Sequence, residues 1–252
     1  MENEYELKLN ALVSAVKAHK PRVIALQEIM QLAENCEISC SDALSLKIPL
    51  KKGNHALNIQ QKLKEMGINY YLYWLGFKKS YGKFDEGVAI LSLNKASNVS
   101  AILLSPFEDY HNWKTRMALG IKIESYWYFS THMGWWSDDE SPLENELTVL
   151  FEKLPQGQVF LMGDFNSPAN ERSRGYDFVI NNGYFDTYFL ASAKDNGITA
   201  KTDIDGWHGG GENVRIDYIF TNKKTDIKSS FTIFNGKNER KISDHYGVMI
   251  EL

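Results

Sequence analysis

Cysteine is nearly absent from this sequence. Cys36 and Cys40 are the only two cysteines among 252 residues, which excludes the framework of several disulfides on which many small secreted proteins depend. A metal site at this pair would need partners that are not nearby. We therefore interpret the two cysteines as free thiols in a reducing compartment.

The sequence also lacks a long apolar run. A membrane-spanning helix needs about 18 or more consecutive apolar residues, and no stretch approaches that length. The N-terminal MENEYELKLN is acidic and polar, unlike a secretory signal. These absences predict a soluble, cytoplasmic protein with no membrane partner.

There is no excess of positive charge either. The chain has 28 Lys and Arg against 32 Asp and Glu, a formal net charge of −4, and its pI is about 5.9. A protein that binds long nucleic acid usually carries a basic surface, because each phosphate contact requires a cation. The charge balance therefore weighs against nucleic acid as the partner, although it leaves room for a local basic patch.

What is present is the composition of a globular domain. Hydrophobic residues make up 43% of the chain and charged residues 24%, a usual balance for a soluble protein. We find no repeat, no low-complexity segment and no linker long enough to divide the chain. The sequence thus predicts one continuous domain over residues 1–252, and it leaves the oligomeric state open.

The hydrophobic pattern predicts many short strands with a few helices between them. Apolar spacing over residues 9–16 predicts an amphipathic helix that ends before Pro21. Further helices are predicted at 59–66, 142–154 and 176–180. Strands are predicted at 23–26, 70–77, 88–93, 99–104, 117–123, 126–130, 159–162, 216–220, 231–234 and 248–252. This alternation indicates an α/β sandwich with helices outside two sheets.

Polar side chains gather where the predicted strands end or begin. They are Glu28 after the strand at 23–26, His132 after 126–130, Asp164 and Asn166 after 159–162, Asp217 in 216–220, and Asp244 with His245 before 248–252. Such residues meet on one rim if their strands share a sheet, and element ends on a rigid scaffold often carry binding and catalysis.

Those residue types favour a particular chemistry. Carboxylates, an amide and histidines without cysteine suit a hard cation, Mg²⁺ with Mn²⁺ as the alternative. Such a cation, with positioned donors, stabilises the negative charge that crowds a phosphate ester during cleavage.

Five motifs carry a family resemblance. They are ALQE at 25–28, THMGWW at 131–136, GDFN at 163–166, RIDYIF at 215–220 and SDHYGV at 243–248. Together they resemble the endonuclease/exonuclease/phosphatase superfamily, to which deoxyribonuclease I belongs, and they occur in family order. The resemblance implies a four-layered α/β sandwich with two mostly antiparallel sheets flanked by helices. DEGVAILS at 85–92, THMGWW and the acidic pI are most similar to maltose 6′-phosphate phosphatases, which implies hydrolysis of maltose 6′-phosphate to maltose and phosphate.

The resemblance also implies a role for each residue of the rim. Glu28 and Asp244 match metal-binding positions. Asp164 and Asn166 match residues that orient the attacking water and hold the phosphate. His245 would contact the scissile phosphate and Asp217 would orient it, because a carboxylate behind an imidazole fixes its tautomer and favours its charged form.

A second histidine and a basic residue complete the implied catalytic set. His132 would pair with Glu86, although the adjacent Asp85 competes for this role. Arg116 matches a position that pairs with phosphate oxygens, with a plain strand-edge arginine as the alternative. Asp164 is our first choice for deprotonating the water, and His132 or a metal-bound water for protonating the leaving sugar oxygen, but the sequence leaves both assignments open.

Aromatic residues near the rim are the candidates for binding a sugar. Trp136 and Trp207 offer flat faces that suit sugar rings, but they suit stacked bases equally well or merely pack the loops. His208 lies in the glycine-rich stretch 205–211, which has the composition of a substrate-gating loop.

One expected feature does not match. Members of the superfamily usually begin with a strand that ends in an asparagine supporting the metal and the phosphate. Here the first predicted helix follows the opening residues at once, and Asn3 and Asn10 lie in or beside it. A sugar-phosphate phosphatase is therefore our first hypothesis, with a nuclease of the same fold and a catalytically impaired binding module as alternatives.

Overall fold

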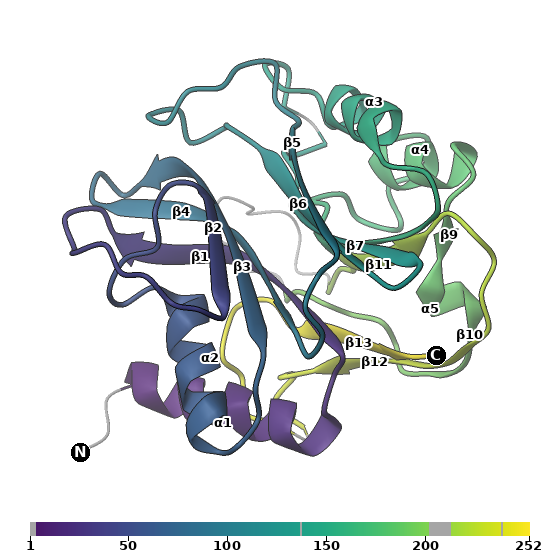
Figure 1. The fold of residues 1–252 in the computed structure, drawn as a ribbon. Helices are drawn as coiled ribbons and strands as arrows, with labels where there is room; N and C mark the ends of the chain where they lie inside the picture. The colour runs from purple at the N-terminus through teal and green to yellow at the C-terminus, as the bar shows by residue number, and fades with distance from the viewer. Residues whose placement is uncertain (1–3, 137, 202–212, 238) are drawn as a thin grey trace.

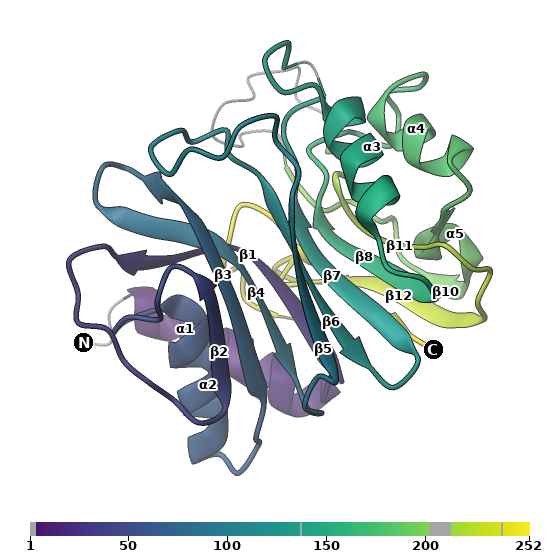
Figure 2. The same cartoon turned by 45° about the horizontal axis from the view of Figure 1, so that its top comes forward.

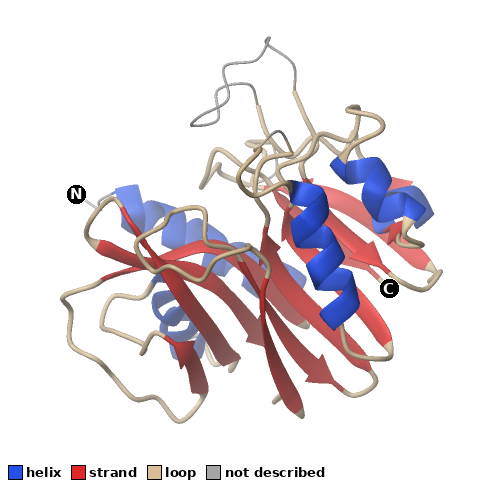
Figure 3. Cartoon of the chain, turned by 90° about the horizontal axis from the view of Figure 1, so that it is seen from above, coloured by secondary structure: helices blue, strands red, loops and turns tan. Residues whose placement is uncertain are grey.

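The computed structural model describes residues 4–136, 138–201, 213–237 and 239–252. Within these ranges the strands form three sheets, and the two larger ones pack face to face. Helices cover the outer faces of the pair, so that four layers follow one another (Figures 1 and 2). Figure 3 shows from above that the helices lie outside and the strands inside. The predicted α/β sandwich is confirmed.

The first large sheet has the strand order β1-β4-β3-β2. Its strands are β1 (Val23–Leu32), β2 (Ala43–Lys47), β3 (Tyr71–Ser80) and β4 (Phe84–Ser92), and its outer helices are α1 (Glu4–His19) and α2 (His55–Glu65). Helix α2 begins at Asn54, whose side chain accepts hydrogen bonds from two backbone N–H groups of the first turn. The stretch from β1 to α2 contains β2, which the sequence did not predict because its residues are mostly exposed and it forms by parallel pairing with β3.

The second large sheet has the order β5-β6-β7-β8-β11-β9. Its strands are β5 (Asn98–Leu103), β6 (Met117–Ile123), β7 (Tyr126–His132), β8 (Gln158–Asp164), β11 (Asp217–Thr221) and β9 (Phe185–Asp186). Its outer helices are α3 (Leu143–Lys153) and α4 (Gly175–Asn181), followed by the short α5 (Thr187–Leu190). No helix in the described part of the chain combines the length and the apolar character that a membrane span requires.

The third sheet is small and was not anticipated. It has the order β10-β12-β13, built from β10 (Ala191–Lys194), β12 (Ile227–Ile233) and β13 (Gly247–Glu251). The sequence predicted two sheets, with the strands at 231–234 and 248–252 among them. The structure instead pairs β12 with β13, and with β10 on the other side, because the parallel partner β10 is too short and exposed to be recognised from its own sequence.

Three apolar layers hold the four structural layers together. Leu75 and Ile90 of the first sheet meet Leu119 and Phe160 of the second in the central layer. A second cluster joins α1 and α2 to the first sheet, and a third joins α3 and α4 to the second sheet. Burial of these residues is the main favourable contribution to folding.

An apolar groove separates β1 from β13. It measures about 590 Å³ and is lined mainly by α1, β1 and β13, and by side chains of the second sheet. At one end it reaches Gln27, Gly163 and Asp217, beside the residues of the predicted rim. The first element of the described residues is α1, and no strand precedes it there.

The central layer offers a test of the packing. Leu119 is fully buried between the two large sheets. We expect Leu119→Ala to lower the free energy of unfolding by roughly 2–5 kcal/mol, because the lost atoms leave a cavity. Leu44→Ala in β2 is the matched control, since Leu44 is 45% exposed, and we expect it to cost less than about 1 kcal/mol. Equal losses in urea unfolding would contradict this layer arrangement.

Candidate active site

The register of three neighbouring strands places a row of polar residues at one edge of the second sheet. Asp164 at the end of β8 lies opposite His132 of the parallel β7 and opposite Asp217 of the antiparallel β11. Directly opposed residues of paired strands have their side chains about 4.5–5.5 Å apart at Cβ. The pairing of the strands therefore brings together side chains that are up to 85 positions apart in the sequence, as expected (217 − 132).

Glu28 reaches the same rim from the first sheet. The pairing of β1 with β4 shifts register between Leu26 and Ile29, and Glu28 within this bulge has a φ of 52°. A bulge redirects a side chain out of the regular alternation, and bulges are common beside active sites. Although solvent reaches part of the side chain, the surrounding protein desolvates the carboxylate, and this with the charge of Glu86 raises the pKa of Glu28.

Glu28, Glu86 and His132 form the first cluster of the site. Each offers one oxygen or nitrogen atom, and these three atoms lie within 4.8 Å of one another. The hydrogen-bonding partners of Glu86, however, are Ser80 and Lys78, whose Nζ lies 3.0 Å from Oε1 of Glu86. Glu86 therefore lies close to His132, but the side chains that bind Glu86 are those of Ser80 and Lys78.

His132 is buried and close to two cations. Burial and the nearby charges of Arg116 and Lys78 lower its pKa well below its ordinary value, so the ring is neutral at pH 7. Its Nε2 lies 3.7 Å from Oδ2 of Asp164. Asp85, the predicted competitor, bonds elsewhere: it pairs with Lys51 and accepts hydrogen bonds from Gln31 and Tyr110.

Asp164, Asp217 and His245 form the second cluster, again within 4.8 Å. Nδ1 of His245 lies 3.0 Å from Oδ2 of Asp217. Burial alone would lower the pKa of His245, but the hydrogen bond to Asp217 and its charge raise it to about 10. At pH 7 the ring is therefore a cation that donates from Nδ1 to Asp217 and keeps Nε2–H for an anion.

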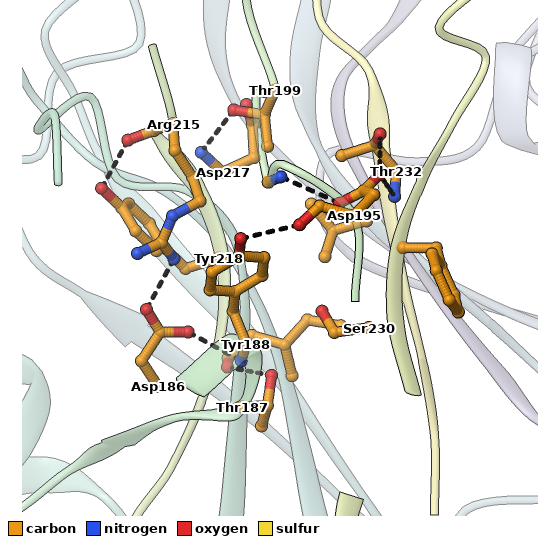
Figure 4. A pocket seen from close by; sticks show the side chains of 14 residues that line it. Asp186, Thr187, Tyr188, Asp195, Thr199, Arg215, Asp217, Tyr218, Ser230 and Thr232 are labelled. Carbon is orange, nitrogen blue, oxygen red and sulfur yellow. Dashed lines mark hydrogen bonds and ion pairs between the residues drawn. The ribbon is translucent and has the colours of Figure 1, made fainter. Parts of the chain in front are cut away.

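Asp217 is itself fixed from behind, as Figure 4 shows. Oγ1 of Thr199 accepts hydrogen bonds from the backbone N–H groups of Ile216 and Asp217, at 3.0 and 3.1 Å. Arg215, two residues before Asp217, pairs with Asp186 at 2.5 Å and is buried among aromatic rings. A cavity of about 10 Å³ remains behind Asp217. These contacts fix the start of β11 and with it the orientation of the His245 ring.

Asp164 and Asn166 are positioned by the GDFN turn. Burial and the charge of Asp217 raise the pKa of Asp164 to about 7. Asn166 adopts a φ of 48°, a conformation that asparagine tolerates better than most residues. Its backbone N–H donates to Oδ1 of Asp164 at 2.7 Å, and its Nδ2 donates to the carbonyl of Met133 at 2.9 Å. The turn thereby ties the end of β8 to the segment that follows His132.

Arg116 lies just before β6 and is only 4% exposed. Its backbone N–H donates to Oγ of Ser105 at 3.1 Å. Two of its side-chain nitrogens, Nε and Nη1, are buried without a hydrogen-bonding partner. Such unsatisfied donors are rare and costly in a folded protein, so an anion that accepts from them would stabilise this arrangement.

Lys78 is a site residue that the sequence analysis missed. It was read as lying beyond the strand at 70–77, yet β3 continues to Ser80 and buries Lys78 against Glu86. Burial and the charge of Arg116 lower the pKa of Lys78 to about 8. Strand alternation could not have found it, because it places position 78 with Gly76 and Trp74 on the face that the helices cover. The register shift between Gly76 and Lys78 instead pairs Lys78 with Glu86 and turns it toward the site.

Four predicted residues lie apart from these clusters or outside the described residues. Asp244 is exposed, and its Oδ1 accepts a hydrogen bond from Ser243, although its charge helps to raise the pKa of both Glu28 and His245. Trp136 is half-buried and packs against the core beneath α3. Trp207 and His208 fall in 202–212, outside the described residues.

The donor set suits a divalent cation. Glu28 and Glu86 bring two carboxylates together in the first cluster, and desolvation together with their mutual repulsion raises the pKa of Glu28. A hard cation would relieve that repulsion, and carboxylate oxygens and a neutral imidazole are suitable ligands for it.

The chain is similar to known proteins over nearly its whole length. The sequence model of the Endonuclease/Exonuclease/phosphatase family matches residues 2–245. No curated protein matches the chain. The solved structure of an endonuclease/exonuclease/phosphatase family protein from Leptotrichia buccalis has a TM-score of 0.87 and 28% identity, covering 100% of this chain and 96% of that one.

Two more distant structures share the fold. A mannosyl-6-phosphatase from Bacteroides thetaiotaomicron has a TM-score of 0.64 and 18% identity, with 98% of this chain and 91% of that one covered. A truncated TDP2 from Caenorhabditis elegans has a TM-score of 0.58 and 19% identity, with the same coverage of each chain.

The Asp217–His245 contact predicts a measurable titration. In Asp217→Asn we expect the pKa of His245 to fall from about 10 toward its ordinary value of 6.5, because the carboxylate that stabilises the cation is gone. Titration of the histidine ring by NMR measures this directly. Asp244→Asn is the matched control, and we expect a smaller decrease because Asp244 is exposed. A pKa of His245 that is unchanged in Asp217→Asn would contradict the contact.

The same contact predicts how stability depends on pH. Because the folded-state pKa of His245 lies above 6.5, its stabilising effect is complete below about pH 6.5 and is lost as the pH rises through about 10. The wild type should therefore lose its stability advantage over Asp217→Asn across that interval. Urea unfolding of both proteins at several pH values measures the difference.

Proposed function

The chain belongs to the endonuclease/exonuclease/phosphatase family, a family of hydrolases, and on that premise we propose that it is a divalent-metal-dependent phosphatase acting on a sugar phosphate. The observation that carries the proposal is the buried guanidinium of Arg116, whose unpartnered N–H groups need an anion. Its charge depresses the pKa of both His132 and Lys78, which places it within electrostatic reach of the first cluster. A phosphate group satisfies this requirement.

The phosphate would be held from two sides in this proposal. Arg116 donates to its oxygens from the β6 side, and the cationic His245 donates from Nε2 on the opposite side. Asn166, fixed by its contacts to Asp164 and Met133, lies in the turn between them. These donors stabilise the charge that develops on the phosphoryl oxygens during attack.

Asp164 is the proposed base. With a pKa of about 7, roughly half of the Asp164 carboxyl groups are ionised at neutral pH and can accept a proton, and Asp164 lies close to both histidines. As the water oxygen bonds to phosphorus, its proton passes to Asp164, the bond from phosphorus to the sugar oxygen breaks, and the sugar oxygen takes up a proton from a water molecule. The low pKa of His132 argues against this ring as the source of the proton for the leaving oxygen.

Glu28 is the central residue of the proposed metal site, with Glu86 beside it and Asp244 on the open side. We propose Mg²⁺ as the ion, with Mn²⁺ as the alternative. When bound, the cation would neutralise negative charge on the phosphate. The carboxylate of Glu28 serves to hold it at the mouth of the site, where the bulge in β1 directs this side chain.

Maltose 6′-phosphate is the substrate that we propose first. Its support is the similarity of the motifs at 85–92 and 131–136 to maltose 6′-phosphate phosphatases. The fold shared with a mannosyl-6-phosphatase is compatible with a sugar phosphate. Trp135 and Trp136 follow His132 by three and four residues in the chain, and neither is fully buried, which leaves aromatic surface for a sugar ring.

A DNA endonuclease is the second candidate, since phosphodiester cleavage uses the same chemistry. The formal net charge of −4 weighs against it, because duplex binding requires a cation for each phosphate contact. A catalytically impaired binding module is the third candidate. The shifted pKa values of Asp164, about 7, and of His245, about 10, weigh against a module that performs no chemistry.

The proposal is tested by phosphate release from maltose 6′-phosphate, with Mg²⁺ and with EDTA, beside nicking of supercoiled plasmid. We expect release only with the metal, and an intact plasmid. His245→Ala should lower kcat at least about 100-fold, the usual effect of removing one donor to a developing anion. His19→Ala is the matched control, because His19 lies on α1 outside both clusters, and it should retain wild-type activity.

Each other result contradicts the proposal in a definite way. Release from mannose 6-phosphate but not from maltose 6′-phosphate would overturn the sugar and keep the phosphatase. Plasmid nicking without release would favour the endonuclease. Absence of both activities would favour the binding module.

A further inference from the structure

Lys78 is a buried cation to which none of the five motifs assigns a role. Its side chain is 5% exposed, and it lies opposite Glu86 in the last part of β3, beyond the register shift after Gly76. Its Nζ lies 3.0 Å from Oε1 of Glu86 and donates to the carbonyl of Trp113 at 3.1 Å. An ammonium group has three N–H donors, so these two contacts leave one donor for a further acceptor.

Both partners of Lys78 point to the phosphate end of the site. Glu86 belongs to the cluster with Glu28 and His132. Trp113 precedes Arg116 by three residues in the loop between β5 and β6, so the ammonium contacts the segment that carries the unpartnered guanidinium. Lys78 and Arg116 thus approach the same region from the two sheets.

Two buried cations close together are unfavourable unless an anion lies between them. Glu86 compensates one positive charge in the free protein. Nε and Nη1 of Arg116 have no acceptor, and the charge of Arg116 is felt at Lys78, where it lowers the pKa of the ammonium. The pair therefore has the charge and the free donors to bind an anion with more than one negative charge.

We propose that Lys78 and Arg116 form a two-cation subsite that selects a terminal phosphate over a phosphodiester. This inference rests on the proposed phosphatase function and names the residue that sets its substrate class. A phosphate monoester carries close to two negative charges at neutral pH, whereas a diester carries one. The third N–H of Lys78 binds the additional anionic oxygen that only the monoester offers.

The test compares p-nitrophenyl phosphate with bis(p-nitrophenyl) phosphate in wild type and Lys78→Gln. Glutamine removes the charge but can still donate to Glu86 and to the carbonyl of Trp113. We expect kcat/KM for the monoester to fall about 10- to 100-fold, the range for loss of a charge-assisted hydrogen bond. For the diester we expect a change below about 3-fold, because it lacks the second charge.

Two controls separate this role from a structural one. Lys79→Met changes the next residue of β3, which points to the other face of the sheet, and should leave the ratio of the two kcat/KM values as in wild type. Lys78→Met is a second variant of the same position, and thermal unfolding of each variant establishes that it folds. Equal losses on both esters in Lys78→Gln would overturn the proposal and leave Lys78 as a positioning residue for Glu86.

A binding measurement distinguishes failure of this inference from failure of the proposed function. Isothermal titration with inorganic phosphate requires no turnover, and we expect binding to be about 10-fold or more weaker in Lys78→Gln than in wild type. If wild type hydrolyses neither ester but shows this difference, the phosphatase proposal fails and the anion subsite stands. If wild type hydrolyses the monoester and phosphate binds equally to both proteins, the subsite proposal fails alone.

Discussion

The register between β7, β8 and β11 is the constraint on which the rest of the site depends. It sets His132, Asp164 and Asp217 side by side at one edge of the sheet. A slip of one residue would turn each side chain to the other face, where the apolar cluster beneath α3 and α4 lies. Because each face of these strands packs against its own apolar cluster, the register that forms the core also fixes the site.

Close packing of ionisable groups then gives each of them a different proton affinity. Burial and the charge of Asp217 bring the pKa of Asp164 to about 7, whereas Asp217 raises that of His245 to about 10. His132 is driven the other way, by burial and by the cations near it. One small region thus holds a cationic ring, a neutral ring and a carboxyl group whose pKa is near 7. Acid–base chemistry requires groups whose pKa values differ in this way.

Much of the fold and of the site could be predicted from the sequence. The short motifs identified the residues of the rim, and the hydrophobic periodicity predicted most of the helices and strands that form the layers. The sequence did not reveal that Lys78 is buried, since a lysine at a strand end is usually solvated and only the folded chain brings Glu86 and the carbonyl of Trp113 to its ammonium group. Nor did it predict the separate third sheet, because β10 becomes a strand only through its pairing with β12. Trp136 was expected to bind sugar, and its packing against the core leaves that role a prediction.

The central claim is that the donors of the buried Arg116 and of the partly buried His245 form an anion site between the two sheets. A crystal structure of the protein with bound tungstate, a phosphate analogue visible by its anomalous scattering, tests it most directly. The account predicts one strong anomalous peak within hydrogen-bonding distance of Nε or Nη1 of Arg116 and of Nε2 of His245. A peak elsewhere on the surface, with both side chains unchanged and without an anion, would contradict it.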